Sequence, residues 1–243
     1  MLKVFIHTCT LLLIPMFLHA QLVIIHSNSD FTNLRSKPGK KGRIIDRAPG
    51  GSICMLKETP VPASQSLARW NRVSRGSYYP VADTVWPRLP EPEGYIHEAQ
   101  YTMLDALPAL KIGLAQDSLL VLEGDTIGVT ISRRLFQAKV HRITWKNHIA
   151  TEIDGRHIWG MDGGIPTTEI SSMTIYKAGQ KWELPASAFH SLYQPDFGRT
   201  AVYLTGQGGI YIVMAGGDGS GSYYAVWAWK DTSLVSTSIF SVP

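Results

Sequence analysis

The stretch Tyr223-Tyr224-Ala225-Val226-Trp227-Ala228-Trp229 decides the fold class, because it is apolar or aromatic at every position. A strand formed by it must be covered on both faces, so we expect it at the centre of a sandwich or rolled sheet. Three more strand-like runs accompany it, separated by glycine-rich or polar turns: 201–205, 210–214 and 234–239. The four runs together predict an antiparallel meander.

The region before this meander is also mainly β. Period-two alternation over 126–131 predicts a half-buried strand. The runs 173–176 and 182–184 flank a turn and predict a hairpin. Residues 185–193 are the best short helix, because a proline begins them where no amide donor is needed. We therefore expect a β-rich domain over 112–243, a β-sandwich or rolled antiparallel sheet with at most a short helix.

The first twenty residues are typical of an export signal. Lys3 gives a positive start, an apolar core follows, and Ala20 puts a small residue before Gln21. The competing interpretation is an uncleaved anchor, but a proline and polar residues interrupt the apolar run, and a span needs about 20 apolar residues. We expect 1–20 to be a signal peptide, a periplasmic or secreted mature chain, and no integral membrane segment after cleavage.

Composition limits the classes of fold and partner. Loss of the signal peptide removes Cys9 and leaves Cys54 alone, so an internal disulfide is excluded. The hydrophobic cores must therefore stabilise the fold without such a cross-link. The formal net charge of the 243-residue chain is +4, and its cations are not clustered, so we expect no nucleic-acid partner. This length favours two domains.

Short strands and strong turns also characterise the N-terminal half. Asn33-Leu34-Arg35-Ser36-Lys37-Pro38-Gly39 is followed by Ile44-Ile45, by Trp70-Asn71-Arg72-Val73 and by Gly94-Tyr95-Ile96-His97. In this order the four strings resemble the bacterial SH3 (SH3b) domain over about 28–104. The resemblance implies an SH3-like barrel that attaches exported proteins to cell-wall peptides or to other proteins.

One departure from that family is large. The chain inserts about residues 75–93, and the prolines there predict a stiff, extended flap, which either covers or shapes a binding groove. We expect a binding groove formed by Arg35, Trp70 and Tyr95, with Tyr78 and Trp86 from the flap. The alternative is a surface loop packed on its own barrel.

The sequence lacks the motifs of several common catalytic and metal sites. Cysteine peptidases often accompany SH3b domains and need a thiolate paired with a histidine, but 105–243 contain no cysteine. Cys54 falls in an apolar run, where a cysteine usually acts as a small buried hydrophobe. No histidine pair has the spacing of a helical zinc site, and the loop after Gly216 lacks the glycine and glutamate of a calcium-binding EF-hand. We therefore expect no catalytic residue, metal ligand or cofactor.

The connection 158–170 combines an aromatic, a carboxylate, paired glycines and a proline. Trp159 and Asp162 are binding candidates, and we expect this connection to approach the loop 216–222 at one end of the sheet. A rigid turn with Trp159 in the core explains the same composition. Both segments are similar to stretches in uncharacterised exported bacterial proteins, and this resemblance does not assign any activity to the chain.

The leading hypothesis is an exported, non-enzymatic binding protein for a cell-wall peptide or a periplasmic protein. An inhibitor or immunity-type protein that blocks a partner enzyme is the second hypothesis. The third is a hydrolase that gathers Asp162, Glu169 and Asp218 around a cleft.

Overall fold

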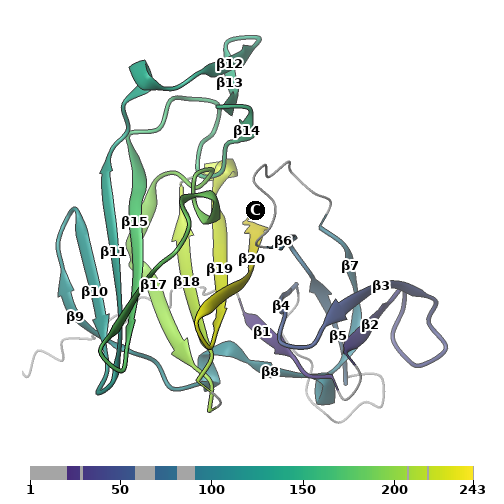
Figure 1. The fold of residues 1–243 in the computed structure, drawn as a ribbon. Helices are drawn as coiled ribbons and strands as arrows, with labels where there is room; N and C mark the ends of the chain where they lie inside the picture. The colour runs from purple at the N-terminus through teal and green to yellow at the C-terminus, as the bar shows by residue number, and fades with distance from the viewer. Residues whose placement is uncertain are drawn as a thin grey trace, which may run out of the picture.

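The computed structural model describes residues 21–27, 30–57, 69–80, 91–206, 208–217 and 219–242. The predicted signal peptide lies outside these residues. Strands β1 to β20 and five short 3-10 helices form the described part, which contains no α-helix (Figure 1). The mainly-β prediction is confirmed. No helix in these ranges is long and apolar enough to cross a membrane.

Seven antiparallel strands form the first sheet, in the order β3-β2-β7-β5-β4-β1-β8. Their bounds are β1 Leu22–Ile25, β2 Phe31–Arg35, β3 Ile44–Pro49, β4 Ile53–Leu56, β5 Trp70–Ser74, β7 Glu93–His97 and β8 Tyr101–Met103. In β2 and β7 every second residue is buried, as the alternation of their sequences predicts. The SH3-like strings therefore lie on neighbouring strands of one sheet.

The first sheet wraps around its own small core without closing. Val23 of β1 and Leu34 of β2 come from distant positions in the strand order, yet they share one buried cluster with Cys54. The described strands β3 and β8 nevertheless remain as edges, so hydrogen bonding does not complete a barrel. Closure is unnecessary for burying the opposite face of β1 and β4, because the C-terminal part of the chain covers it there.

The C-terminal part contains two larger sheets and a small one. The second sheet has the order β16-β15-β11-β10-β9 and the third sheet β17-β18-β19-β20-β6. Their bounds are β6 Ser77–Pro80, β9 Lys111–Ala115, β10 Leu119–Glu123, β11 Ile127–Leu135, β15 Thr168–Lys177, β16 Gln180–Glu183, β17 Pro195–Leu204, β18 Ile210–Gly216, β19 Tyr223–Lys230 and β20 Ser233–Ser241. The small sheet contains β12 Ile143–Lys146, β13 Ile149–Ile153 and β14 Arg156–His157, and it extends one end of the second sheet (Figure 1).

These elements confirm most of the expected C-terminal pattern. The meander appears as β17 to β20, and the hairpin as β15 and β16. The short helix is reduced to one 3-10 turn, Ala186–Ala188. It ends early because the following residues bond to another segment: the Trp159 amide donates to Ser191, and the Tyr193 amide donates to Trp159.

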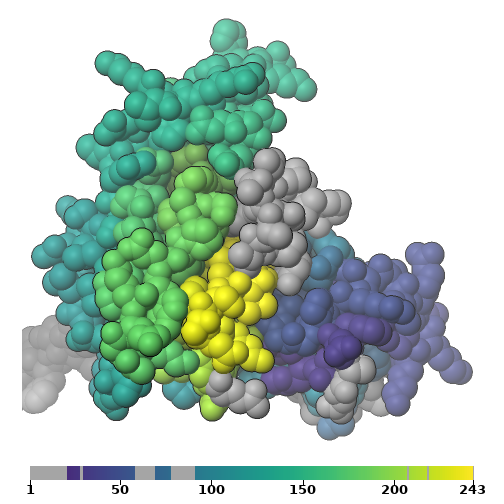
Figure 2. All heavy atoms as spheres, viewed as in Figure 1, coloured from purple at the N-terminus to yellow at the C-terminus, as the bar shows by residue number. Residues whose placement is uncertain are grey.

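Three sheets are stacked in layers, which explains why the central run is apolar on both faces. One face of the third sheet packs on the second sheet, where Ile131 meets Ile212 and Trp227 in one core. Its other face packs on the first sheet through a shared core that includes Ile53 and Val213. Strand β19 is the third of five strands, so it is central as predicted. Figure 2 shows the C-terminal strand lying between the two parts of the chain.

The described beginning of the inserted segment, Ser77–Pro80, joins the C-terminal sheet. Its strand β6 pairs with β20, and Tyr78 lies opposite Ser238. Residues 81–90, which include Trp86, lie outside the described ranges. The insertion thus connects the two units across the predicted boundary.

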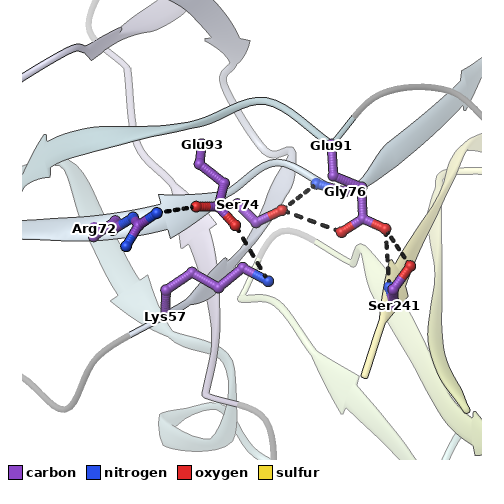
Figure 3. A network of polar contacts seen from close by, with 7 residues as sticks. All are labelled: Lys57, Arg72, Ser74, Gly76, Glu91, Glu93 and Ser241. Carbon is purple, nitrogen blue, oxygen red and sulfur yellow. Dashed lines mark hydrogen bonds and ion pairs between the residues drawn. The ribbon is translucent and has the colours of Figure 1, made fainter. Parts of the chain in front are cut away.

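A carboxylate reinforces this connection (Figure 3). Glu91 Oε1 accepts hydrogen bonds from the Ser241 amide at 3.0 Å and from its hydroxyl at 2.6 Å. Glu91 Oε2 accepts from Ser74 Oγ of the first sheet at 3.4 Å. One carboxylate therefore holds the end of β20 against β5, and such charge-assisted bonds contribute more than neutral ones.

Candidate functional site

A groove of about 450 Å³ lies on the outer side of the first sheet. Strand β2 supplies Asn33 and Arg35, β5 supplies Trp70, and β7 ends at His97. Lys40, from the turn between β2 and β3, completes the cationic part of the lining. The turn that contains Pro38 and Gly39 thus places Lys40 on the lining of the same groove as Trp70.

Neighbouring contacts fix the side chains of the groove. Arg35 Nη1 donates to the Gly42 carbonyl at 2.8 Å, which ties the turn to the strand. The Trp70 and His97 rings meet edge to face at 5.5 Å, since the two residues are directly opposite on β5 and β7. His97 Nδ1 accepts from the Ala99 amide at 3.2 Å, so in the neutral ring Nε2 carries the proton. Asn33 Oδ1 is buried without a hydrogen-bond partner among the described residues.

The structure brings together only part of the predicted groove. Arg35 and Trp70 line it, and Trp70 is half-buried instead of fully buried in the core. Tyr95 lies opposite Arg35 and Arg72 in the sheet but does not line the groove. Tyr78 belongs to β6 of the third sheet, and Trp86 lies outside the described residues.

Sequence reasoning missed Lys40, His97 and Asn33. A signal for His97 was present, because period-two alternation places it on the same face of its strand as Tyr95. Lys40 carried no such signal, since it belongs to a turn whose course depends on Arg35 and Gly42.

The two C-terminal loops meet as expected. Ser220 Oγ donates to Asp162 Oδ1 at 2.7 Å, and the Gly160 amide donates to the Gly221 carbonyl at 2.9 Å. Trp159, however, is only 3% exposed and belongs to the core between the second and third sheets. The contact is therefore a close-packed backbone junction with an exposed Asp162, and this favours the rigid-turn interpretation.

The three carboxylates of the hydrolase hypothesis do not form one described cluster. Asp162 contacts Ser220, whereas Glu169 lines a different cavity beside His141. Asp218 lies outside the described residues.

Metal and thiol chemistry find little support in these parts of the chain. Within the described ranges, no three His, Cys, Asp or Glu side chains are placed to hold a metal ion. Cys54 is buried, and this burial raises the pKa of its thiol to about 12. A protonated thiol is a poor nucleophile.

Comparison of the chain with protein-family models, curated proteins and solved structures finds no match.

Proposed function

We propose that the chain is an exported, non-enzymatic binding protein that recognises a cell-wall peptide or a periplasmic protein through the groove of the first sheet. The observation that carries this proposal is the grouping of Arg35, Lys40 and His97 around the half-buried Trp70. The groove offers a mainly apolar lining with the cationic side chains of Arg35 and Lys40 beside it. The preferred ligand segment is therefore a peptide that presents a carboxylate and an apolar group.

The energetic roles of the groove residues differ. An aromatic anchor in a groove contributes most of the binding energy in many interfaces, about 2 kcal/mol or more, which is a roughly 30-fold change in affinity. Lys40 is exposed, so its attraction to a carboxylate is screened by water and salt. We expect Lys40 to contribute about 0.2–1 kcal/mol, or up to about fivefold.

Sedimentation of the mature chain with purified peptidoglycan tests the proposal. We expect Trp70→Ala to weaken binding by about 30-fold and Lys40→Gln by up to about fivefold. Lys41→Gln is the matched control, because Lys41 is the adjacent exposed lysine and does not line the groove. Thermal unfolding of each variant shows whether the fold is retained.

Two results would reject the proposal. One is binding that Trp70→Ala and Lys40→Gln leave unchanged, and the other is no binding to peptidoglycan or to any periplasmic protein. Capture of one periplasmic enzyme with loss of its activity would favour the inhibitor hypothesis instead. Export is tested separately, because mass spectrometry of the native protein should find Gln21 at its N-terminus.

A further inference from the structure

A second cavity, of about 190 Å³, lies where the small sheet meets the ends of β11 and β15. Segments far apart in sequence supply its polar lining. His141 precedes β12, and Asp154 and Arg156 surround the turn between β13 and β14. Glu169 is the second residue of β15, and His190 and Tyr193 precede β17. None of these residues belongs to the groove of the first sheet.

Asp154 fixes the orientation and the proton of His141. His141 Nδ1 lies 2.7 Å from Asp154 Oδ2, and the Arg142 amide donates to Asp154 Oδ1 at 2.9 Å. Burial alone would raise the pKa of Asp154, but its hydrogen bonds to His141 and to the Arg142 amide, together with the charge of Arg156, hold it below its usual value. An ionised Asp154 accepts, so in the neutral ring the proton is on Nδ1 and Nε2 is an acceptor. Phe136 stacks on the ring at 4.6 Å and holds its plane.

Glu169 places a second acceptor opposite the first. It is 9% exposed, and its Oε1 accepts from Arg134 Nε at 2.7 Å. Its Oε2 lies 4.0 Å from His141 Nε2, too far for a hydrogen bond. His141 Nε2 is buried and has no hydrogen-bond partner among the described residues. A buried acceptor without a donor costs about 1–3 kcal/mol, so the pair favours a donor placed between them.

An ammonium nitrogen satisfies this geometry. A nitrogen placed about 2.8 Å from each of the two acceptors would bond to both, since this is the usual length of a charge-assisted bond. Tyr193 lines the same cavity, and burial together with the charges of Glu169 and Asp154 raises the pKa of its phenol. The hydroxyl therefore stays neutral, and its oxygen remains available as a further acceptor.

Charge and size limit the rest of the ligand. Two guanidinium groups, Arg134 and Arg156, and two carboxylates, Asp154 and Glu169, line the cavity, so its formal charge is balanced when both histidines of the lining, His141 and His190, are counted as neutral. A balanced cavity favours a ligand that carries both signs over one with a net charge. At about 30 Å³ per water-sized group, the volume holds about six heavy atoms.

We propose that this cavity binds a small α-amino acid. Its ammonium group donates to His141 Nε2 and Glu169 Oε2, its carboxylate lies against Arg156, and its side chain contacts the apolar wall formed by Ile170 and Phe189.

Calorimetric titration of the mature chain at pH 7 tests the site with four probes: L-alanine, D-alanine, ethylamine and propionate. Ethylamine is alanine without the carboxylate, and propionate is alanine without the ammonium group. We expect at least one enantiomer of alanine to bind tenfold more tightly than either single-charge probe. The proposal would be overturned if both enantiomers of alanine bound no more tightly than ethylamine or propionate, or if neither bound at 50 mM.

Two variants assign the contacts. Glu169→Gln keeps the shape, and its amide oxygen can still accept from Arg134 Nε, but it replaces the acceptor Oε2 by an NH₂ group that cannot accept from an ammonium group. We expect at least tenfold weaker alanine binding with no loss of thermal stability, whereas a purely structural Glu169 would lose stability and leave affinity unchanged. Arg156→Gln should reduce alanine affinity to that of ethylamine.

Glu152→Gln is the matched control, because Glu152 is an exposed carboxylate of β13 that does not line the cavity. Alanine binding that Glu169→Gln leaves unchanged would overturn the proposal. Trp70 and Lys40 are intact in all these variants, so failure of this site is distinguishable from failure of the groove.

Discussion

Ile53 tests whether the two units of the chain share one core. It is 2% exposed on β4 and packs in the cluster that joins the first and third sheets, with Val213 and Tyr224 on the opposite side. Ile53→Ala removes three carbons, and at about 0.8 kcal/mol each their transfer to water costs about 2.4 kcal/mol. The residual cavity adds to this, so we expect a total loss of about 2–5 kcal/mol.

The loss should appear in both units at once. Thermal unfolding followed by far-UV circular dichroism and by tryptophan fluorescence should show one transition, because Ile53 stabilises both sides of the shared core. For a chain of this size 1 kcal/mol shifts the midpoint by about 2–4 °C, so we expect a decrease of at least about 5 °C. Ile44→Ala is the control in the same sheet, since Ile44 is 44% exposed, and it should cost less than about 1 kcal/mol.

Separate transitions would refute this reasoning. If Ile53→Ala shifted only one of two transitions, the units would unfold independently and the contact between sheets would contribute little to either. An unchanged midpoint would mean that Ile53 is not buried in the shared core.

Three further predictions follow from single residues. Burial raises the pKa of Cys54 to about 12 from an ordinary 9.0, so the contribution of the protonated thiol to the free energy of unfolding is complete below pH 9 and is lost as pH rises toward 12. Cys54→Ala should therefore flatten the decrease in the free energy of unfolding with pH, as measured by urea titrations. A thiol reagent at pH 8 should label Cys54 only in urea. A Cβ at Gly221 would collide with the backbone of the adjacent loop, so Gly221→Ala should lower the melting temperature by several degrees, whereas Gly206→Ala, with open space around it, should not. Among the described residues Asp162→Ala removes the exposed bond from Ser220, so calorimetry should find a loss of about 1 kcal/mol or less, and a larger loss would mean a structural role.

Local sequence determined most of the strands, since their signals are local. Alternation and turns predicted β11, the β15–β16 hairpin and the meander, because period-two burial and turn residues act over a few positions. The apolar run at 223–229 also predicted its own central place. Arg35 and Trp70 were found because neighbouring strands of the first sheet bring their strings together.

Only the tertiary structure decided how the sheets share edges and faces. Strand β6 pairs with β20 from the other end of the chain, and neither sequence specifies the partner, because any free edge offers the same backbone groups. The cavity around His141, Asp154 and Glu169 has the same origin. Each of these residues alone is an ordinary polar residue of a turn or strand end. The buried His141 Nε2, which has no hydrogen-bond partner among the described residues, arises only where these distant segments pack together. The sequence determines the chemistry of each side chain, but the distances between charged groups depend on long-range packing.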